Sequence, residues 1–386
     1  MVKKTKMLAL SISFILAICS YAAAEWQVPD TGQNECYDFD NHKIIDCGNT
    51  GQDGSYKETT NQPSYTKLDS NGEVLPDDAE TWAMVQDNVT GLIWEVKTDS
   101  NKSTTYTWDE ADAYVKSLSL GESSAEWRLP TIKELAFIVN RGTANPSVNK
   151  TYFANTQSDF YWSSDDFVPQ ADSASNEAWV VKFNDGRVEY VTHDKSTSEH
   201  YVRAVRGDKL SVSRFIDNGD GTVTDVATKL MWKQTPESMA WKDVPAYCEE
   251  LTFPEENGYS DWRAPNINEL QSLADYSKNI TINTNAFPDA AGKYYWSSTT
   301  RAEANENHHA WYMGAGGDIY RGDKGASKNV LPVRGPVDEI FNFGHAILGL
   351  KALAGLEENG PYLDMNGDQK TGLEDIIFVL RNIAGL

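Results

Sequence analysis

The chain has 386 residues, a length that suggests two to four domains, and 40% of them are hydrophobic, enough to form cores. Its 57 acidic residues outnumber its 34 basic residues, which gives a net charge of −23. This charge argues against binding to nucleic acid or to an anionic membrane surface.

Residues 1–24 have the pattern of a secretory signal peptide. Lysines at positions 3, 4 and 6 precede an apolar run from Met7 to Cys19, and Ala22–Ala24 offers a small-residue cleavage site. The run is too short to span a membrane, and no other segment is a candidate span. We therefore expect a secreted, extracellular or cell-surface protein without a membrane span.

A cysteine-containing leader is expected at residues 25–64. Cys36 and Cys47 lie in a segment rich in Gly, Asp and Asn, and export would permit a disulfide between them. A zinc site is the weaker alternative, because His42 is the only histidine nearby. Cys248 lies in AWKDVPAYCEEL (240–251), a segment similar to TWDEADAYVKSL (107–118), in which Val115 stands at the same place, so we expect Cys248 to be a buried thiol.

Residues 65–335 contain a tandem repeat. Matched blocks occur in the same order in both copies: GLIW (91–94) and KLMW (229–232), TWDEADAYVKSL (107–118) and AWKDVPAYCEEL (240–251), EWRLPTIKEL (126–135) and DWRAPNINEL (261–270), and YWSS at 161–164 and 295–298. The repeat predicts one domain at 65–207 and a second at 208–335. Each copy shows two helical patterns and several antiparallel strand patterns, which predicts an α+β fold.

The Glu of the EWRLPTIKEL block has two interpretations. Thr131 with Glu134, and Asn266 with Glu269, have the spacing of a helix capping box, in which the Glu bonds back to the N-cap amide. General-acid chemistry is the alternative for these carboxylates, and capping is the interpretation we favour.

Ten of the 12 tryptophans recur at matched positions, which is typical of a shared core rather than a binding surface. Residues that differ between the copies are better candidates for a ligand surface: Trp82, His308, His309, Tyr312 and Tyr320. Half-exposed aromatic residues without a ligand are the alternative.

The last segment, residues 336–386, carries a candidate calcium loop. In DMNGDQKTGLED, side-chain oxygens of Asp364, Asn366, Asp368 and Asp375 fall at loop positions 1, 3, 5 and 12, and Lys370 supplies a carbonyl at position 7. A polar connector between two helices is the alternative. The loop and the following IIFVLRNIAGL resemble a dockerin, although only one such loop is present. The resemblance implies a small all-α, EF-hand-like module, calcium as its cofactor and a cohesin-like partner.

The repeated blocks resemble the Lcl C-terminal domain of a Legionella collagen-like adhesin. The motifs that carry this resemblance are DNVTGLIW and DVATKLMW, GYSDWRAPNINELQSLADYS, YYWSSTT, HHAWYM and PVRG. The resemblance implies two tandem C-type-lectin-like domains, surface or secreted placement, and adhesion to glycans. The related formylglycine-generating enzymes need a cysteine pair that neither copy has.

The sequence therefore predicts an exported, non-enzymatic binding or adhesion protein with a calcium-stabilised tail for assembly or anchoring. A glycan or polysaccharide is the expected ligand class. A component of extracellular polysaccharide-degrading machinery is the alternative, although no catalytic constellation stands out, and a purely structural surface protein is a third interpretation.

Overall fold

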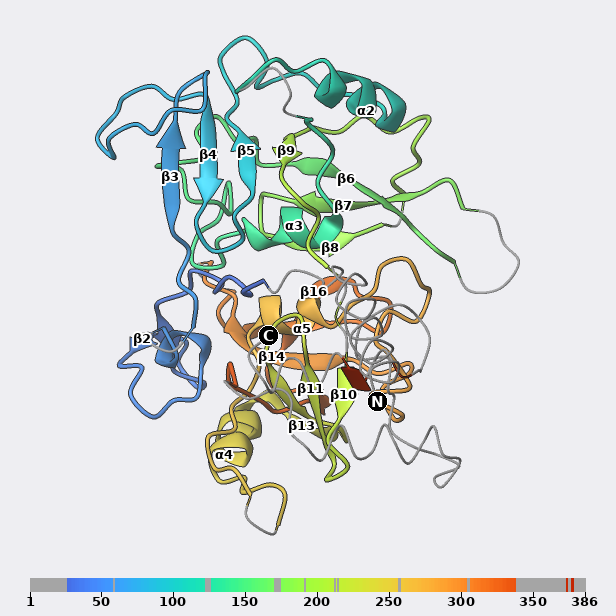
Figure 1. Ribbon diagram of the computed structural model, residues 1–386. Coiled ribbons are helices and arrows are strands. Elements are labelled where there is room, and N and C mark those ends of the chain that lie inside the picture. The colour runs from blue at the N-terminus through green and yellow to red at the C-terminus, as the bar shows by residue number, and fades with distance from the viewer. Residues whose placement is uncertain are drawn as a thin grey trace, which may run out of the picture. The chain divides into compact units, whose positions relative to one another are not determined.

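The computed structural model describes residues 26–337, except for short gaps at 58–59, 122–125, 170–174, 191, 212, 214, 256–257 and 304–305, together with Leu373, Ile376 and Ile377. Residues Glu25–Ile340 form one unit that contains the leader and both repeats (Figure 1). The predicted signal peptide lies outside the described residues, and so does the predicted C-terminal module apart from its first two residues and those last three.

The predicted fold class is wrong, because the described part is mainly β rather than α+β. It has 18 short strands and only four α-helices, each of six to nine residues: α2 (Trp108–Lys116), α3 (Ile132–Phe137), α4 (Val244–Glu249) and α5 (Ile267–Ser272). No small all-α module is evident in the described residues, and the sheets do not establish a C-type-lectin-like fold. Helical periodicity located the helices, but it does not limit their length. Strands of two to four residues carry too little alternation to be counted from sequence.

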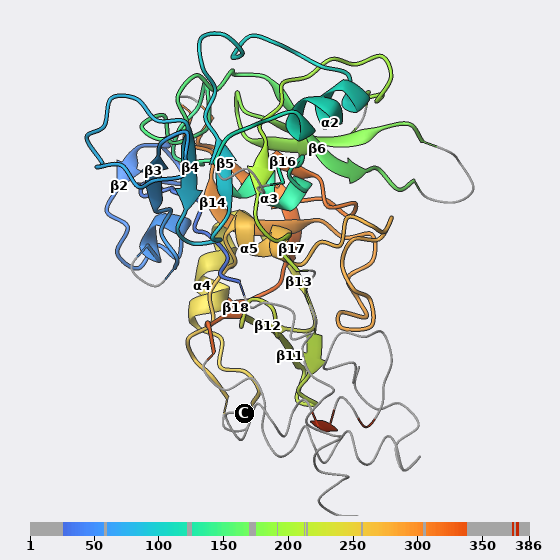
Figure 2. The same cartoon turned by 45° about the horizontal axis from the view of Figure 1, so that its top comes forward.

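Each repeat begins and ends in a small antiparallel sheet, and the two sheets have the same strand order. In the first repeat the order is β3 (Tyr65–Leu68), β4 (Met84–Asp87), β5 (Ile93–Glu95) and β9 (Val205–Arg206). In the second it is β10 (Phe215–Asp217), β11 (Thr222–Asp225), β12 (Met231–Lys233) and β18 (Val333–Arg334); β10 is labelled in Figure 1 and the other three in Figure 2. The first and last strands of each repeat therefore lie in one sheet, which closes each copy on itself.

A larger sheet runs through both repeats. Its eight strands follow the order β13 (Glu237–Ala240), β17 (Ser327–Val330), β14 (Tyr295–Thr300), β15 (His309–Met313), β16 (Ile319–Asp323), β8 (Arg187–Glu189), β7 (Ala178–Lys182) and β6 (Phe160–Asp166). The two repeats meet where β8 pairs antiparallel with β16, with Val188 opposite Ile319. Helix α3 contacts β6 and β7, α5 contacts β14 and β15, and the two helices contact each other.

Tryptophans and aliphatic side chains fill the core, as the repeat predicts. Nine of the ten matched tryptophans are buried: Trp94, Trp127, Trp162, Trp179, Trp232, Trp241, Trp262, Trp296 and Trp311. The main hydrophobic cluster includes residues of both repeats and also Trp26 of the leader, which lies 5.6 Å from the ring of Phe137. The two repeats and the leader thus share one core.

The leader packs on the second repeat. It contains β1 (Cys36–Tyr37), β2 (Ile44–Ile45) and the 3-10 turn η1 (Asp53–Ser55), and it holds the predicted Cys36–Cys47 disulfide. Outside the leader, the second repeat has a 3-10 turn of its own, η2 (Trp241–Asp243), which directly precedes α4. The Gln33 side-chain amide makes two hydrogen bonds with the backbone of Thr300: its Nε2 donates to the Thr300 carbonyl, and its Oε1 accepts from Thr300 N at 2.8 Å. Asn268 of α5 donates to the carbonyl of Pro29 at 3.1 Å. These contacts give the leader a fixed place on the second copy.

Candidate functional site

The repeated Glu of the EWRLPTIKEL block caps a helix in both copies. Thr131 caps α3 and Asn266 caps α5, and both capping boxes are complete. Each Glu also accepts two bonds from the preceding Arg: Glu134 from Arg128 at 2.7 and 2.8 Å, and Glu269 from Arg263 at 2.6 and 2.5 Å. Sequence reasoning missed this pairing, although the six-residue Arg–Glu spacing recurs in both copies. Carboxylates held in this way are not suited to general-acid chemistry.

The five residues predicted as a ligand surface do not form one site. Trp82 lies in the first repeat, where its Nε1 donates to the carbonyl of Tyr152 at 2.8 Å and Lys67 Nζ lies 4.1 Å from its ring. The other four lie in the second repeat, on β15 and β16 or directly before them. Trp82 therefore serves local packing, and the second repeat carries the candidate surface.

Tyr312 and Tyr320 are cross-strand neighbours on β15 and β16. The Tyr320 hydroxyl donates to Glu189 Oε2 of the first repeat at 3.2 Å, and burial raises the pKa of Tyr320. Tyr320 therefore belongs to the contact between the repeats rather than to a free surface.

Tyr312 contributes to a surface that we call the aromatic–lysine face, formed by Tyr294, Tyr312 and Lys328. Lys328 Nζ lies 4.1 Å from the Tyr312 ring centroid, 5.8 Å from that of Tyr294, and 4.8 Å from that of the buried Trp296 beneath. Tyr294 is 50% exposed. Burial lowers the pKa of Lys328. Sequence reasoning missed Tyr294 and Lys328, since the first copy also has an aromatic residue, Phe160, at the position of Tyr294.

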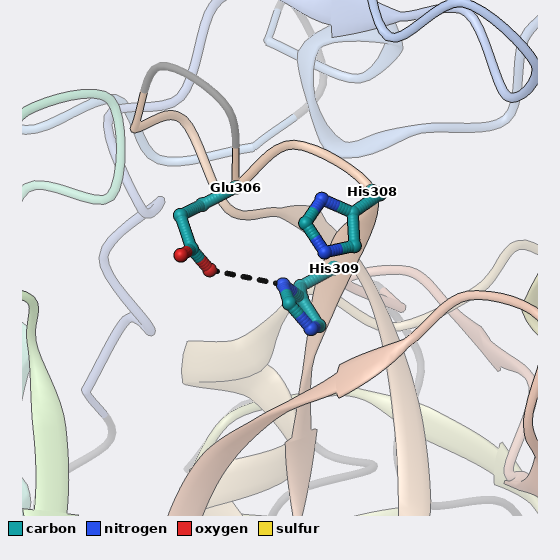
Figure 3. Close-up of side chains that lie close together, drawn as sticks. All are labelled: Glu306, His308 and His309. Carbon is teal, nitrogen blue, oxygen red and sulfur yellow. Dashed lines mark ion pairs between the residues drawn. The ribbon is translucent and has the colours of Figure 1, made fainter.

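His308 and His309 lie together with Glu306 in a group that we call the histidine cluster (Figure 3). A tight turn, in which His309 N donates to Glu306 O at 2.9 Å, places the Glu306 carboxylate beside the imidazole that opens β15. His309 Nδ1 lies 3.1 Å from Glu306 Oε2, and the two imidazole centroids are 3.9 Å apart. Burial, followed by His308, lowers the pKa of His309, which favours the neutral ring at neutral pH.

Charged groups of both repeats surround the histidine cluster. Arg301 Nη1 lies 3.0 Å and Arg321 Nε 3.7 Å from Glu306 Oε2. Arg301 Nη2 and Arg321 Nη1 each also lie 3.8 Å from Oδ2 of Asp185, a residue at the hairpin turn of the first repeat. The cluster is therefore adjacent to an ion network that joins the two repeats.

The leader borders the same region. The His42 ring centroid lies 5.6 Å from that of His308, and the Asn307 amide donates to the His42 carbonyl. A cavity of about 540 Å³ is lined by His42, Tyr37 and Ile44 of the leader and by Ala302 and Asn307 of the second repeat. The sequence placed His42 only near the cysteines, because its proximity to residue 308 depends on the fold.

A second cavity, of about 650 Å³, lies between the repeats. The turn at Asn88–Gly91 of the first repeat and the equivalent turn at Ala227–Leu230 of the second both line it. Trp26 and Arg263 contribute further walls. The turns belong to the DNVTGLIW and DVATKLMW motifs, so the repeated motif forms both sides of one cavity.

The thiol of Cys248, predicted to be buried, lies in the described part of the chain, whereas the predicted calcium loop does not. Cys248 is a buried free thiol, and burial raises its pKa to about 12, so it is unsuited to nucleophilic chemistry.

The predicted calcium ligands, Asp364, Asn366, Asp368, Lys370 and Asp375, all lie outside the described residues. Among the residues that the structure describes, no helix is both long and apolar enough to cross a membrane.

The family comparison agrees with the repeat. The model of the Lcl C-terminal domain matches residues 83–206 and again residues 221–334, within the two domains predicted from the sequence. No curated protein matches the chain. The two matched segments cover more than half of the sequence, and each contains the last three strands of one four-stranded sheet, β4, β5 and β9 or β11, β12 and β18. The chain therefore belongs to the Lcl C-terminal domain family and carries two tandem copies of that domain.

Proposed function

We propose that this chain is an exported, non-enzymatic binding protein that attaches to a surface polymer, with carbohydrate as the ligand class. The observation that carries the proposal is the tandem match to the Lcl C-terminal domain, a domain of an adhesin. The Cys36–Cys47 disulfide supports export, because such bonds persist in oxidising compartments outside the cytosol.

The aromatic–lysine face is the part of the second repeat best suited to such a ligand. Tyr294 and Tyr312 offer apolar ring faces with polar hydroxyl tips, a combination favoured at binding surfaces. Lys328 adds a cation that could pair with a carboxylate or sulfate on the polymer. Tyr312 and Lys328 lie on strands β15 and β17, and Tyr294 directly precedes β14, so recognition would need little rearrangement of the backbone.

The test is retention on immobilised neutral, uronic-acid and sulfated polysaccharides. We expect retention of the wild-type chain, and about tenfold weaker binding, ~1.4 kcal/mol, for Tyr294→Ala and Tyr312→Ala. Tyr259→Ala is the matched control, because Tyr259 is an exposed tyrosine elsewhere in the second repeat.

Two outcomes would count against this proposal. Equal retention of the wild type and the Tyr294 and Tyr312 variants would remove the aromatic–lysine face from the binding site. Release of soluble sugar from a polysaccharide would instead favour the polysaccharide-degrading alternative.

We also propose that the C-terminal loop binds one calcium ion that stabilises a tail used for assembly or anchoring. The support is the spacing of Asp364, Asn366, Asp368 and Asp375, which places oxygen ligands around a tight turn. Titration of the full chain with calcium should show one binding event, lost in an Asp364→Ala/Asp368→Ala double variant. Calcium binding that is equal in both proteins would exclude this loop.

A further inference from the structure

The histidine cluster has a composition and geometry that the proposed binding function does not use. We propose that Glu306, His308 and His309 bind a divalent transition metal of the zinc class, with His42 of the leader as the fourth ligand. The bound ion would join the leader to the second repeat.

The first support is distance. One ligand atom from each of Glu306, His308 and His309 lies within 4.8 Å of the others. Ligand atoms around a tetrahedral zinc ion are roughly 3.4 Å apart, since zinc–nitrogen and zinc–oxygen bonds are about 2.0 Å long. Small side-chain rotations would close the difference without moving β15.

The second support is the environment of His309 Nδ1. This buried atom lies 3.1 Å from Glu306 Oε2, yet it has no hydrogen-bond partner. The separation suits a hydrogen bond, but the direction of an N–H at Nδ1 does not. A lone pair on Nδ1 and a carboxylate oxygen would repel each other unless a cation were shared between them. Glu306 Oε2 already accepts from Arg301 Nη1 at 3.0 Å, so the unpartnered atom of the pair is His309 Nδ1, and a metal ion bound by Nδ1 and the Glu306 carboxylate would give it a partner.

The third support is the charge balance. The surrounding network contains three guanidinium groups, those of Arg187, Arg301 and Arg321, and four carboxylates, those of Asp185, Glu189, Glu303 and Glu306. Arg141 also interacts with Asp185, which brings the guanidinium groups to four, so the network has no excess positive charge that would repel a cation. Glu306 uses Oε2 for its contacts with Arg301, Arg321 and His309, and Oε1 takes part in none of those three.

The leader supplies the fourth group. His42 is a residue with positive φ (60°), and its backbone is held on both sides: its N–H donates to Asp38 O at 3.1 Å and its carbonyl accepts from Asn307. Its Nδ1 is buried without a hydrogen-bond partner, and its ring lies beside that of His308. An unpaired imidazole nitrogen at this position is available to a metal that the other three residues hold.

The ligand types select the metal. Imidazole nitrogens suit zinc, copper and nickel, whereas calcium and magnesium prefer oxygen-only sites. Two or three imidazoles with one carboxylate match zinc sites in proteins. The site is thus distinct in chemistry from the predicted calcium loop at the C-terminus.

The test uses the full-length chain, without an affinity tag and freed of metal by a chelator. Zinc chloride is titrated calorimetrically in excess calcium, which keeps the C-terminal loop from contributing. We expect one zinc ion per chain, confirmed by elemental analysis after dialysis. We also expect an affinity at least tenfold lower for His308→Ala and for His309→Ala. His200→Gln is the matched control, since it removes a histidine of the first repeat.

A second readout separates metal binding from folding. Zinc should slow proteolysis of the leader in the wild type and in His200→Gln, but not in His42→Ala, whose thermal stability without zinc should equal that of the wild type. Absence of stoichiometric zinc in the wild type, or unchanged affinity in both His308→Ala and His309→Ala, would overturn the site. Unchanged protection in His42→Ala would overturn the role of the leader.

Discussion

Asp53 shows how one leader residue completes the second repeat. Its Oδ2 accepts from Thr31 at 2.6 Å and from Thr299 at 2.7 Å. Thr299 also accepts from the first amide of α5, that of Ile267, at 3.0 Å. In the first repeat the residue equivalent to Thr299 is Asp165, whose carboxylate accepts directly from Ile132 N, the first amide of α3, at 2.6 Å. The leader therefore supplies, through Asp53, the carboxylate that the second repeat lacks.

The pKa of Asp53 is raised well above its ordinary value, first by burial and then by the nearby carboxylate of Asp30. The folded chain thus holds a proton on this carboxyl at a pH where the unfolded chain has lost it. The resulting stabilisation is fully present below the unfolded pKa of 3.8 and is lost as the pH rises through the folded pKa.

Replacing Asp53 with Asn should therefore flatten the pH dependence of stability. The neutral amide keeps an acceptor for Thr31 and Thr299 but does not titrate. We expect thermal unfolding at pH 7.5 to occur at an equal or higher temperature in Asp53→Asn than in the wild type, with the difference vanishing toward pH 4. Asp220→Asn, in an exposed turn, is the control. A variant destabilised by the same amount at every pH would indicate that Asp53 is charged in the folded chain.

At the level of elements, the sequence predicted what is encoded locally. The caps of α3 and α5 were predictable because Thr131 with Glu134, and Asn266 with Glu269, need only a three-residue spacing. The buried tryptophans were predictable because the repeat matches them. The overall fold class was not, because short strands are defined by pairing partners far along the chain. β5 and β9, for example, are more than 100 residues apart in sequence.

The candidate site was predicted only in part, for the same reason. His308 and His309 stood out because the first copy has Asn176 and Glu177 there. Glu306 and His42 did not stand out, since a turn brings the first to His309 and the docked leader brings the second to His308. The hydrogen bond between Asn307 and His42 joins residues 265 positions apart, and no local sequence pattern records such a contact.

At the scale of the whole molecule, the two repeats form one pseudo-symmetric body. Val188 and Ile319 occupy equivalent positions in the two repeats. Val188 of β8 pairs with Val181 of β7, and Ile319 of β16 pairs with Met313 of β15. They also pair with each other where β8 meets β16, and both are fully buried. Each repeat thus covers the edge strand of the other, which would otherwise expose unpaired backbone groups.

This arrangement predicts that damage at the junction spreads to both copies. Ile319→Ala should lower the free energy of unfolding by about 2–5 kcal/mol, because a buried Ile leaves a cavity. Hydrogen exchange should then accelerate in β7 and α3 of the first repeat as well as in β15 of the second. Val330→Ala is the control: Val330 is equally buried, but in a cluster formed only by the second repeat.

In the control, exchange should accelerate in the second repeat and leave β7 unchanged. If Ile319→Ala likewise affected only the second repeat, the copies would be independent folding units that merely touch at β8 and β16. If both repeats respond, the shared sheet is a cooperative element. A ligand held by the second repeat would then stabilise the first by the same linkage, so the two copies would act as a single binding body.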